Sequence, residues 1–176
     1  MTEGKLYFAY GSNINLDQMA HRCPAAEVVG PVVLENYRLL FRGNYRGNGV
    51  ATVAPRKGSK VHGLLWKITP VCEKSLDTYE AFPHLYEKQP VTVQDRNGHA
   101  FAVMVYIMTE RCKEPAVPSN FYYNGILEGY RQNGLPTAAL KRALECSVKD
   151  IHAWTTRLNQ QANLSGKKKG RSDHER

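Results

Sequence analysis

Short apolar segments, each followed by a turn, fill the first two-thirds of this 176-residue chain and limit the folds open to it. Four of them are typical of strands, at 28–33, 37–41, 49–54 and 61–68. Two more, 86–94 and 100–108, flank an Asn-Gly pair that favours a hairpin turn. Helical spacing of apolar residues appears only after Pro118, over 119–132, in a segment opened by Pro136, and over 148–158. This order predicts an α+β fold, with helices packed around a mixed, strongly curved or barrel-like β-sheet.

The stretch from Lys5 to Asn13 is an apolar run, predicted as a strand, that ends abruptly in Gly11, Ser12 and Asn13. Gly, Ser and Asn are favoured where backbone N–H groups must point outward, and the residues from Asn15 to Met19 read as the start of a helix. A strand–loop–helix junction of this kind can bind an anion or a carbonyl oxygen through its amides. The alternative interpretation is a tight turn without a ligand, which is the commoner role of a bare Gly-Ser-Asn.

A second informative segment spans residues 75–90. Leu76 and Glu80 have the i,i+4 spacing of a short helix that ends at Pro83, and a strand begins at Tyr86. Glu80 is thus expected at a helix end beside aromatic and apolar neighbours, a setting that raises the pKa of a carboxyl group toward neutrality. The alternative is a solvated surface carboxylate, like Glu87, which is the commoner role of a glutamate.

Three motifs in this order make the chain resemble the gamma-glutamyl cyclotransferase-like proteins, including the AIG2-like group. They are Tyr10 to Asn13 after a strand, Leu76-Asp77-x-x-Glu80 ahead of Tyr86, and Pro118-Ser119-x-x-Tyr122 followed by Asn133-Gly134-Leu135-Pro136. The resemblance covers about residues 5 to 145. One position departs from the family pattern, because Ala81 stands where a glycine often follows the family glutamate.

The resemblance implies the same α+β architecture and a reaction on a small gamma-glutamyl substrate. In that reaction the free α-amine attacks its own γ-carbonyl, releases an amine or amino acid and closes 5-oxoproline. Because ring closure is intramolecular, the protein needs neither a nucleophile nor a metal, and no cofactor is expected. Glu80 is the candidate general base and, later, general acid. The amides of Gly11, Ser12 and Asn13 would hold the substrate carboxylate or the oxyanion, and Tyr10, Tyr86 and Tyr122 would line the substrate site.

The glycine-rich segment Gly43–Gly49 lacks the Gly-Lys-Ser/Thr of a phosphate-binding loop, so a hairpin loop is the prediction there. Arg42, Tyr45 and Arg46 could meet a substrate carboxylate, although arginines in exposed hairpins usually face water.

Other candidate nucleophiles and metal ligands are weaker. Ser12 lacks the Gly-x-Ser-x-Gly context of a hydrolase nucleophile, and His21 and Cys23 have no further ligands nearby in the sequence. The four cysteines are far apart and form no C-x-x-C pair, which predicts reduced thiols rather than a disulfide framework or a zinc knuckle.

Length and a 42% hydrophobic composition fit one domain, which we expect over residues 1–164. Residues 165–176 are polar, interrupted by glycines and rich in lysine and arginine, and they predict a disordered basic tail. The net charge of +8 raises the question of nucleic acid, but no nucleic-acid-binding motif is present, so such a partner is not expected. The absence of a long apolar stretch and of a signal-peptide pattern predicts a soluble, cytoplasmic protein without a membrane partner.

Two questions stay open at this level. A non-catalytic pocket for a small carboxylate-bearing ligand is the alternative to an enzyme, although a Glu at position 80 favours the enzyme because an anion pocket gains nothing from a buried carboxylate. The leaving group and the oligomeric state, a homodimer included, do not follow from the sequence.

Overall fold

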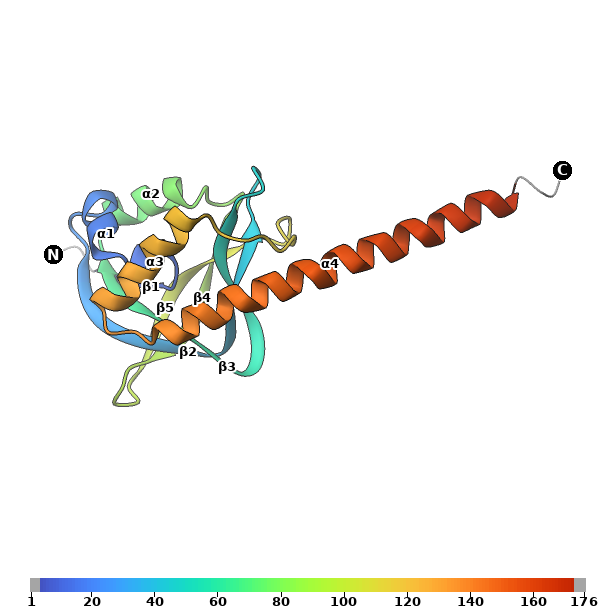
Figure 1. Cartoon of the computed structure of the whole chain (residues 1–176). Helices are drawn as coiled ribbons and strands as arrows, with labels where there is room; N and C mark the ends of the chain where they lie inside the picture. The colour runs from blue at the N-terminus through green and yellow to red at the C-terminus, as the bar shows by residue number, and fades with distance from the viewer. Residues whose placement is uncertain (1–3, 173–176) are drawn as a thin grey trace.

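The computed structural model describes residues 4–172, with side chains up to residue 166, and its five strands form one closed barrel (Figure 1). The strand order around the barrel is β1-β3-β2-β4-β5. The strands are β1 (Lys5–Ala9), β2 (Glu27–Gly43), β3 (Gly49–Ile68), β4 (Tyr86–Gln94) and β5 (Ala100–Met108). The helices are the 3₁₀ turn η1 (Ser12–Ile14), α1 (Leu16–Arg22), α2 (Pro70–Tyr79), α3 (Asn120–Gln132) and α4 (Thr137–Ser172). The α+β, barrel-like fold predicted from the sequence is confirmed.

The central hairpin of β2 and β3 is longer than the sequence indicated. The four segments predicted as separate strands merge into two, which pair from Glu27 opposite Lys67 to Gly43 opposite Gly49. Register shifts interrupt the ladder between Val28 and Gly30 and again after Glu35. The predicted breaks are therefore irregularities within strands, and such bulges let a long hairpin bend enough to close a barrel.

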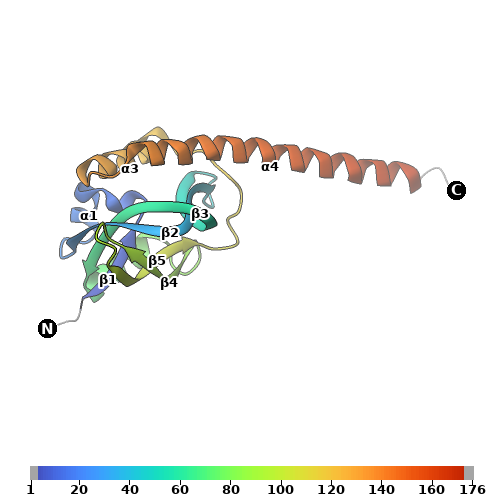
Figure 2. The ribbon, with the colours of Figure 1, turned by 90° about the horizontal axis from the view of Figure 1, so that it is seen from below.

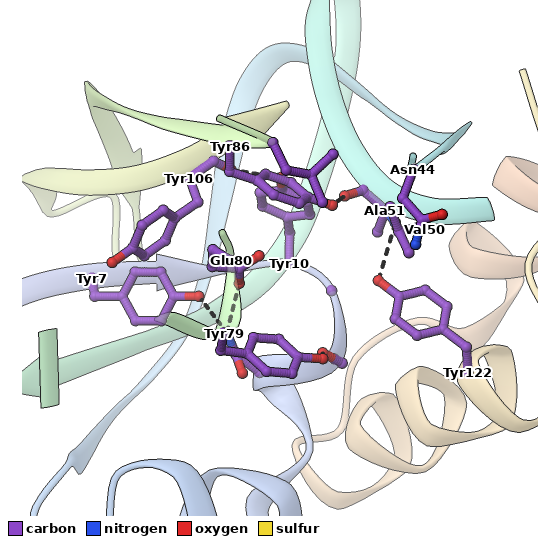
Figure 3. Close-up of a pocket in the computed structure, with 14 residues that line it drawn as sticks. Tyr7, Tyr10, Asn44, Val50, Ala51, Tyr79, Glu80, Tyr86, Tyr106 and Tyr122 are labelled. Carbon is purple, nitrogen blue, oxygen red and sulfur yellow. Dashed lines mark hydrogen bonds between the residues drawn. The ribbon is translucent and has the colours of Figure 1, made fainter. Parts of the chain in front are cut away.

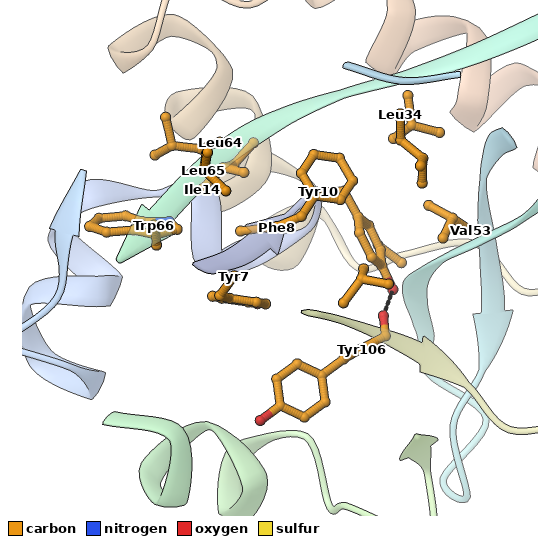
Figure 4. Close-up of a cluster of buried hydrophobic side chains, with 14 of the residues drawn as sticks. Tyr7, Phe8, Tyr10, Ile14, Leu34, Val53, Leu64, Leu65, Trp66 and Tyr106 are labelled. Atoms are coloured by element: carbon orange, nitrogen blue, oxygen red, sulfur yellow. Dashed lines mark hydrogen bonds between the residues drawn. The ribbon is translucent and has the colours of Figure 1, made fainter. Parts of the chain in front are cut away.

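The β4–β5 hairpin has the predicted bounds, and β5 closes the barrel through a parallel pairing of Met104 with Tyr7 of β1. Buried side chains gather around β1 (Figure 4). Phe8 is fully buried and lies so close to Gly63 of β3 that a Cβ there would overlap its ring. A glycine at position 63 thus permits the tight packing of β1 on β3.

Helix α3 holds the chain that follows β1. The side-chain amide of Asn133 donates to the Ile14 carbonyl at 2.8 Å, and the side chain of Gln132 accepts from the backbone N–H of Leu16 at 2.8 Å. Gly129 lets the helix approach closely, because a Cβ at that position would lie 2.6 Å from the Ile14 side chain. These contacts fix the loop between β1 and α1 from one side.

Helix α4 is a single 36-residue element, whereas the sequence predicted two helices after Pro136. Its first half packs on the barrel through buried Leu140 and Ala143, and its second half extends past the barrel (Figures 1 and 2). Every residue from 155 to 166 is exposed. Within the described part of the chain, none of the helices combines the length and the apolar character needed to cross a membrane.

The helix continues through residues 165–172, which the sequence analysis assigned to a disordered tail. Residues 173–176 of that tail lie outside the described residues. A domain boundary at residue 164 stays a prediction.

Truncation after Leu164 is expected to leave the free energy of unfolding unchanged, because the removed segment follows a stretch of fully exposed helix. Urea denaturation measures this free energy, and two substitutions in the same helix give values with which the truncated protein can be compared. Leu140→Ala should lower the free energy of unfolding by about 2–4 kcal/mol, since Leu140 is completely buried. Leu164→Ala should have no measurable effect, because Leu164 is 64% exposed. A truncated protein as unstable as Leu140→Ala would show that the tail belongs to the folded domain.

Candidate active site

A cavity of about 230 Å³ lies where the loop after β1 meets the end of α2 (Figure 3). It contains all seven residues that the sequence analysis placed in one site: Tyr10, Gly11, Ser12, Asn13, Glu80, Tyr86 and Tyr122. Seven further residues line it, among them Tyr7, Tyr79 and Tyr106. The cavity therefore joins residues from β1, β3, β4, β5, α2 and α3.

The loop after β1 is rigidly held. The indole of Trp66 donates to the Asn13 carbonyl at 3.0 Å, and the side chains of Ser12 and Asn13 are buried. Gly11 has a φ of −108°, so this position does not require positive φ. Glycine is suited to it by crowding, because a Cβ would lie 3.3 Å from the Ala51 methyl group and 3.6 Å from the Tyr122 hydroxyl.

Glu80 is the C-cap residue of α2, and its amide donates to the Leu76 carbonyl at 2.8 Å. The Glu80 Oε1 atom accepts a hydrogen bond of 3.0 Å from the side-chain amide nitrogen (Nδ2) of Asn13. Burial raises the pKa of Glu80 to about 7, while the Arg22 charge and the Asn13 hydrogen bond oppose this rise. The pKa of this carboxyl group therefore lies well above the ordinary glutamate value of 4.5.

The chain turns sharply immediately after Glu80. Ala81 has a φ of 47°, in the left-handed region that favours glycine. Its amide donates to the Thr78 carbonyl, and its carbonyl accepts from the amides of His84 and Leu85. This explains why glycine suits the same position in the family pattern. The turn separates the end of α2 from β4 and allows Glu80 and Tyr86 to line one cavity.

Arg22, the last residue of α1, is a functional candidate that the sequence analysis missed. One guanidinium nitrogen donates to Asn13 Oδ1 at 2.8 Å and to Ser12 Oγ at 3.2 Å, and the other donates to Gln18 Oε1 at 2.8 Å. The guanidinium also lies 3.7 Å from the centre of the Tyr79 ring, a cation–π geometry. The i,i+4 spacing of Gln18 and Arg22 is a local signal, but it does not indicate contact with Asn13.

The contact with Arg22 determines which way the Asn13 amide points. Because Oδ1 accepts from Arg22, Nδ2 faces the other side, where it donates to Glu80 and to the Tyr7 hydroxyl at 2.9 Å. Arg22 therefore acts on Glu80 in two ways, through its charge and through the orientation of Asn13.

Three of the tyrosine hydroxyls of the cavity form hydrogen bonds with the backbone. Tyr10 donates to the Tyr106 carbonyl and Tyr86 donates to the Ala51 carbonyl, both at 2.6 Å, while the Tyr122 hydroxyl accepts from the Ala51 amide at 3.0 Å. Burial raises the pKa values of Tyr10, Tyr86 and Tyr122 above the ordinary range. These phenols therefore stay neutral at physiological pH and provide a fixed, largely aromatic wall.

Other candidates from the sequence lie elsewhere. Of the Gly43–Gly49 segment, only Asn44 lines the cavity. Tyr45 donates to the His84 carbonyl instead, and Arg42, which precedes the segment, lines a separate cavity beside α4. Cys23 is buried, and its thiol contacts the Cys72 carbonyl. Among residues 4–166, no cluster of three or more His, Cys, Asp or Glu side chains could hold a metal ion.

A sequence model of the family described as gamma-glutamyl cyclotransferase, AIG2-like, matches residues 7–124, the range that holds the loop, Glu80 and Tyr122. A human gamma-glutamylcyclotransferase is 34% identical over 142 residues, which cover 76% of this chain and 74% of the human protein. The mouse gamma-glutamylcyclotransferase is 33% identical over 139 residues, or 74% and 72% of the two chains. A solved structure titled gamma-glutamyl cyclotransferase superposes with a TM-score of 0.73 at 29% identity, covering 80% of this chain and 86% of that one.

The chain belongs to the AIG2-like gamma-glutamyl cyclotransferase family. It is therefore an enzyme of the gamma-glutamyl cyclotransferase type, as the resemblance of its motifs implied.

Arg22→Gln is expected to raise the pKa of Glu80 above about 7, because it removes a positive charge that favours the ionised carboxylate. Carbon-13 NMR of the glutamate carboxyl groups over a pH titration measures this pKa directly. Arg22→Lys is the control. It keeps the positive charge but lacks the two guanidinium nitrogens that donate to Asn13 and Gln18, so the rise in the pKa of Glu80 should be smaller than in Arg22→Gln. An unchanged Glu80 titration in Arg22→Gln would show that the two groups are not coupled.

Proposed function

We propose that this enzyme releases 5-oxoproline from a small gamma-glutamyl compound, with Glu80 as its proton-transfer residue. The observation that carries the proposal is a carboxyl group with a pKa of about 7, enclosed in an aromatic cavity beside a loop of backbone amides. A general base functions best when its pKa lies near the working pH, and the environment of Glu80 provides that match.

In the proposed reaction, the substrate glutamyl group folds so that its α-nitrogen approaches its γ-carbonyl carbon. The Glu80 carboxylate takes a proton from the α-ammonium, and the freed amine attacks the carbonyl to form a five-membered ring. The electron pair of the carbonyl moves onto its oxygen. When the tetrahedral intermediate collapses, the bond to the leaving nitrogen breaks, and protonated Glu80 gives its proton to that nitrogen. The ring nitrogen still carries one proton too many, which the regenerated Glu80 carboxylate takes and passes to the released amine, so that the amine leaves as an ammonium ion. No group of the protein forms a covalent bond with the substrate.

The cavity suits a reaction in which the protein positions the substrate and transfers protons between its two nitrogen atoms. Its walls are rigid because the hydroxyls of Tyr10 and Tyr86 are tied to the backbone, which favours one folded substrate conformation. The backbone amides of Gly11, Ser12 and Asn13 are proposed to bind the substrate carboxylate or the developing oxyanion, a contribution of a few kcal/mol in an ordered site.

The proposed location of the enzyme is the reducing cytoplasm, and its four free cysteines are consistent with that location.

A non-catalytic pocket for a carboxylate ligand is less well supported. Ionised Glu80 would repel such a ligand, and its burial costs the folded state stability for no gain in affinity. The same cost is justified if the group must accept and return a proton.

Glu80→Gln is expected to reduce the release of 5-oxoproline on the order of a hundredfold or more, because the substitution removes the base while keeping size and an acceptor for Asn13. The measurement is turnover across gamma-glutamyl amino acids, glutathione and gamma-glutamyl amines, which also identifies the leaving group. Glu87→Gln, at an exposed position on β4, is the matched control and should be fully active. Near-normal turnover in Glu80→Gln would exclude Glu80 as the base.

The same variant should be more stable than the wild type at alkaline pH. The pKa of Glu80 is raised in the folded state from an ordinary value of 4.5 to about 7, so wild-type stability falls as pH rises through that interval. Thermal unfolding should therefore give Glu80→Gln the higher melting temperature at pH 8 and no such advantage at pH 4. A lower melting temperature of the variant at pH 8 would contradict the burial of the charged carboxylate.

Gly11→Val is expected to raise KM more than it lowers stability, because the added side chain would press on Ala51 and the Tyr122 hydroxyl at the cavity wall. Steady-state kinetics and urea denaturation of one preparation separate the two effects. Gly98→Val gives the contrast: it strains the distant β4–β5 turn, where φ is 80°, and should lower stability without changing KM. An unchanged KM in Gly11→Val would remove the loop from the substrate site.

A further inference from the structure

We propose that a second cleft, between α4 and the bent part of the β2–β3 hairpin, binds a small anion that carries several phosphate groups. The cleft has a volume of about 390 Å³ and is formed by residues from β2, β3, α3 and α4. It shares no residue with the tyrosine-lined cavity. The site is therefore separate from the proposed chemistry of Glu80.

One wall of the cleft is a built loop within β3. Lys60 pairs with Glu35 and Pro55 with Tyr37, so residues 56–59 are left over opposite Asn36. The Asn36 side chain accepts from the Gly58 amide at 3.1 Å, and Gly58 has a φ of 79°. This segment reads Arg56-Lys57-Gly58-Ser59-Lys60, and its irregularity places the side chains of both Arg56 and Lys60 at the cleft.

Three elements bring positive charge to this one place. Arg56 and Lys60 come from β3, Arg38 from β2 and Arg142 from α4 (Figure 2 shows α4 running along this side of the barrel). Among residues 4–166, no Asp or Glu lines the cleft. Among the described side chains, Arg56, Lys60 and Arg142 make no ion pair, and Arg38 has only a long contact of 3.8 Å with Asp150. Like charges held together with few counter-charges favour an anionic ligand.

His62, which also lines the cleft, responds to this field. Its pKa is lowered first by burial and then by the charges of Lys60 and Arg142, while Glu35 acts in the opposite direction. Glu35 is the acidic group that faces this region from β2. The lowered pKa makes His62 a reporter of charge inside the cleft.

The arrangement favours a compact ligand over a nucleic-acid strand. The cations converge from several sides on one hollow, as several phosphate groups on one small molecule require, whereas a strand needs basic groups spaced along a track. Arginine guanidinium groups can each bind a phosphate with two parallel hydrogen bonds. The remaining lining includes Leu39, Val61 and Ala143, which supply an apolar floor for a non-phosphate part of the ligand.

The test is calorimetric titration of the full-length protein with inorganic tripolyphosphate at near-physiological ionic strength. The double variant Lys60→Gln/Arg142→Gln removes two cleft cations, and Lys57→Gln/Lys141→Gln removes two exposed neighbours that do not line the cleft. Both carry the same change in net charge. We expect saturable 1:1 binding by the wild type, a loss of about tenfold or more in affinity for the cleft variant, and a much smaller loss for the control. The absence of saturable binding, or equal losses in both variants, would overturn the proposal.

Two further measurements identify the ligand class and the place of binding. Tripolyphosphate should raise the pKa of His62 in NMR titrations of the wild type, because an anion beside the imidazole favours its protonated form. An unchanged pKa would place the anion elsewhere. A single-stranded RNA oligomer that binds more tightly than tripolyphosphate, with equal weakening in both double variants, would indicate a diffuse nucleic-acid surface and contradict the cleft. Release of 5-oxoproline should be the same in all these proteins, so the outcome does not depend on the role of Glu80.

Discussion

The hydrogen bond from the Asn13 amide to the Glu80 carboxylate connects two segments that lie 67 residues apart in the sequence. One segment is fixed by Trp66 and α3, and the other is the end of α2. The barrel brings these segments together because β1 pairs with β3, and α2 follows β3 directly. The proton-transfer chemistry proposed for Glu80 depends on this contact, since a carboxylate in open water would have neither the raised pKa nor a defined direction.

Two opposing effects set the ionisation of Glu80. Burial disfavours the charged form, and by itself would keep the group protonated at neutral pH. The Arg22 charge and the Asn13 hydrogen bond lower the pKa again, which leaves it at about 7. A single network of α1, the β1 loop and α2 thus adjusts the group to the range in which it can both accept and release a proton. Such tuning costs stability, as is common at catalytic sites.

The two halves of helix α4 differ in how they contact the barrel. Its buried first half, which includes Leu140, covers the barrel and forms a wall of the basic cleft. The half beyond residue 154 contributes nothing to the core, because its side chains up to residue 166 are exposed. Arg142 of this first half joins Arg38, Arg56 and Lys60 at the cleft, which lies at the bend of β3.

The sequence by itself determined which segments form strands and helices and the candidate site residues that lie within the three motifs. Alternating apolar segments and turns predicted the strands, and three motifs pointed to the family and to Glu80, because these signals reside in neighbouring residues. Arg22, the cavity roles of Tyr7 and Tyr106, and the convergence of Arg38, Arg56 and Arg142 appeared only in the tertiary structure. The merging of four predicted strands into two also required it. The physical reason is that cavities, pKa shifts and bent ladders arise from contacts between residues far apart in the chain, which local patterns do not encode.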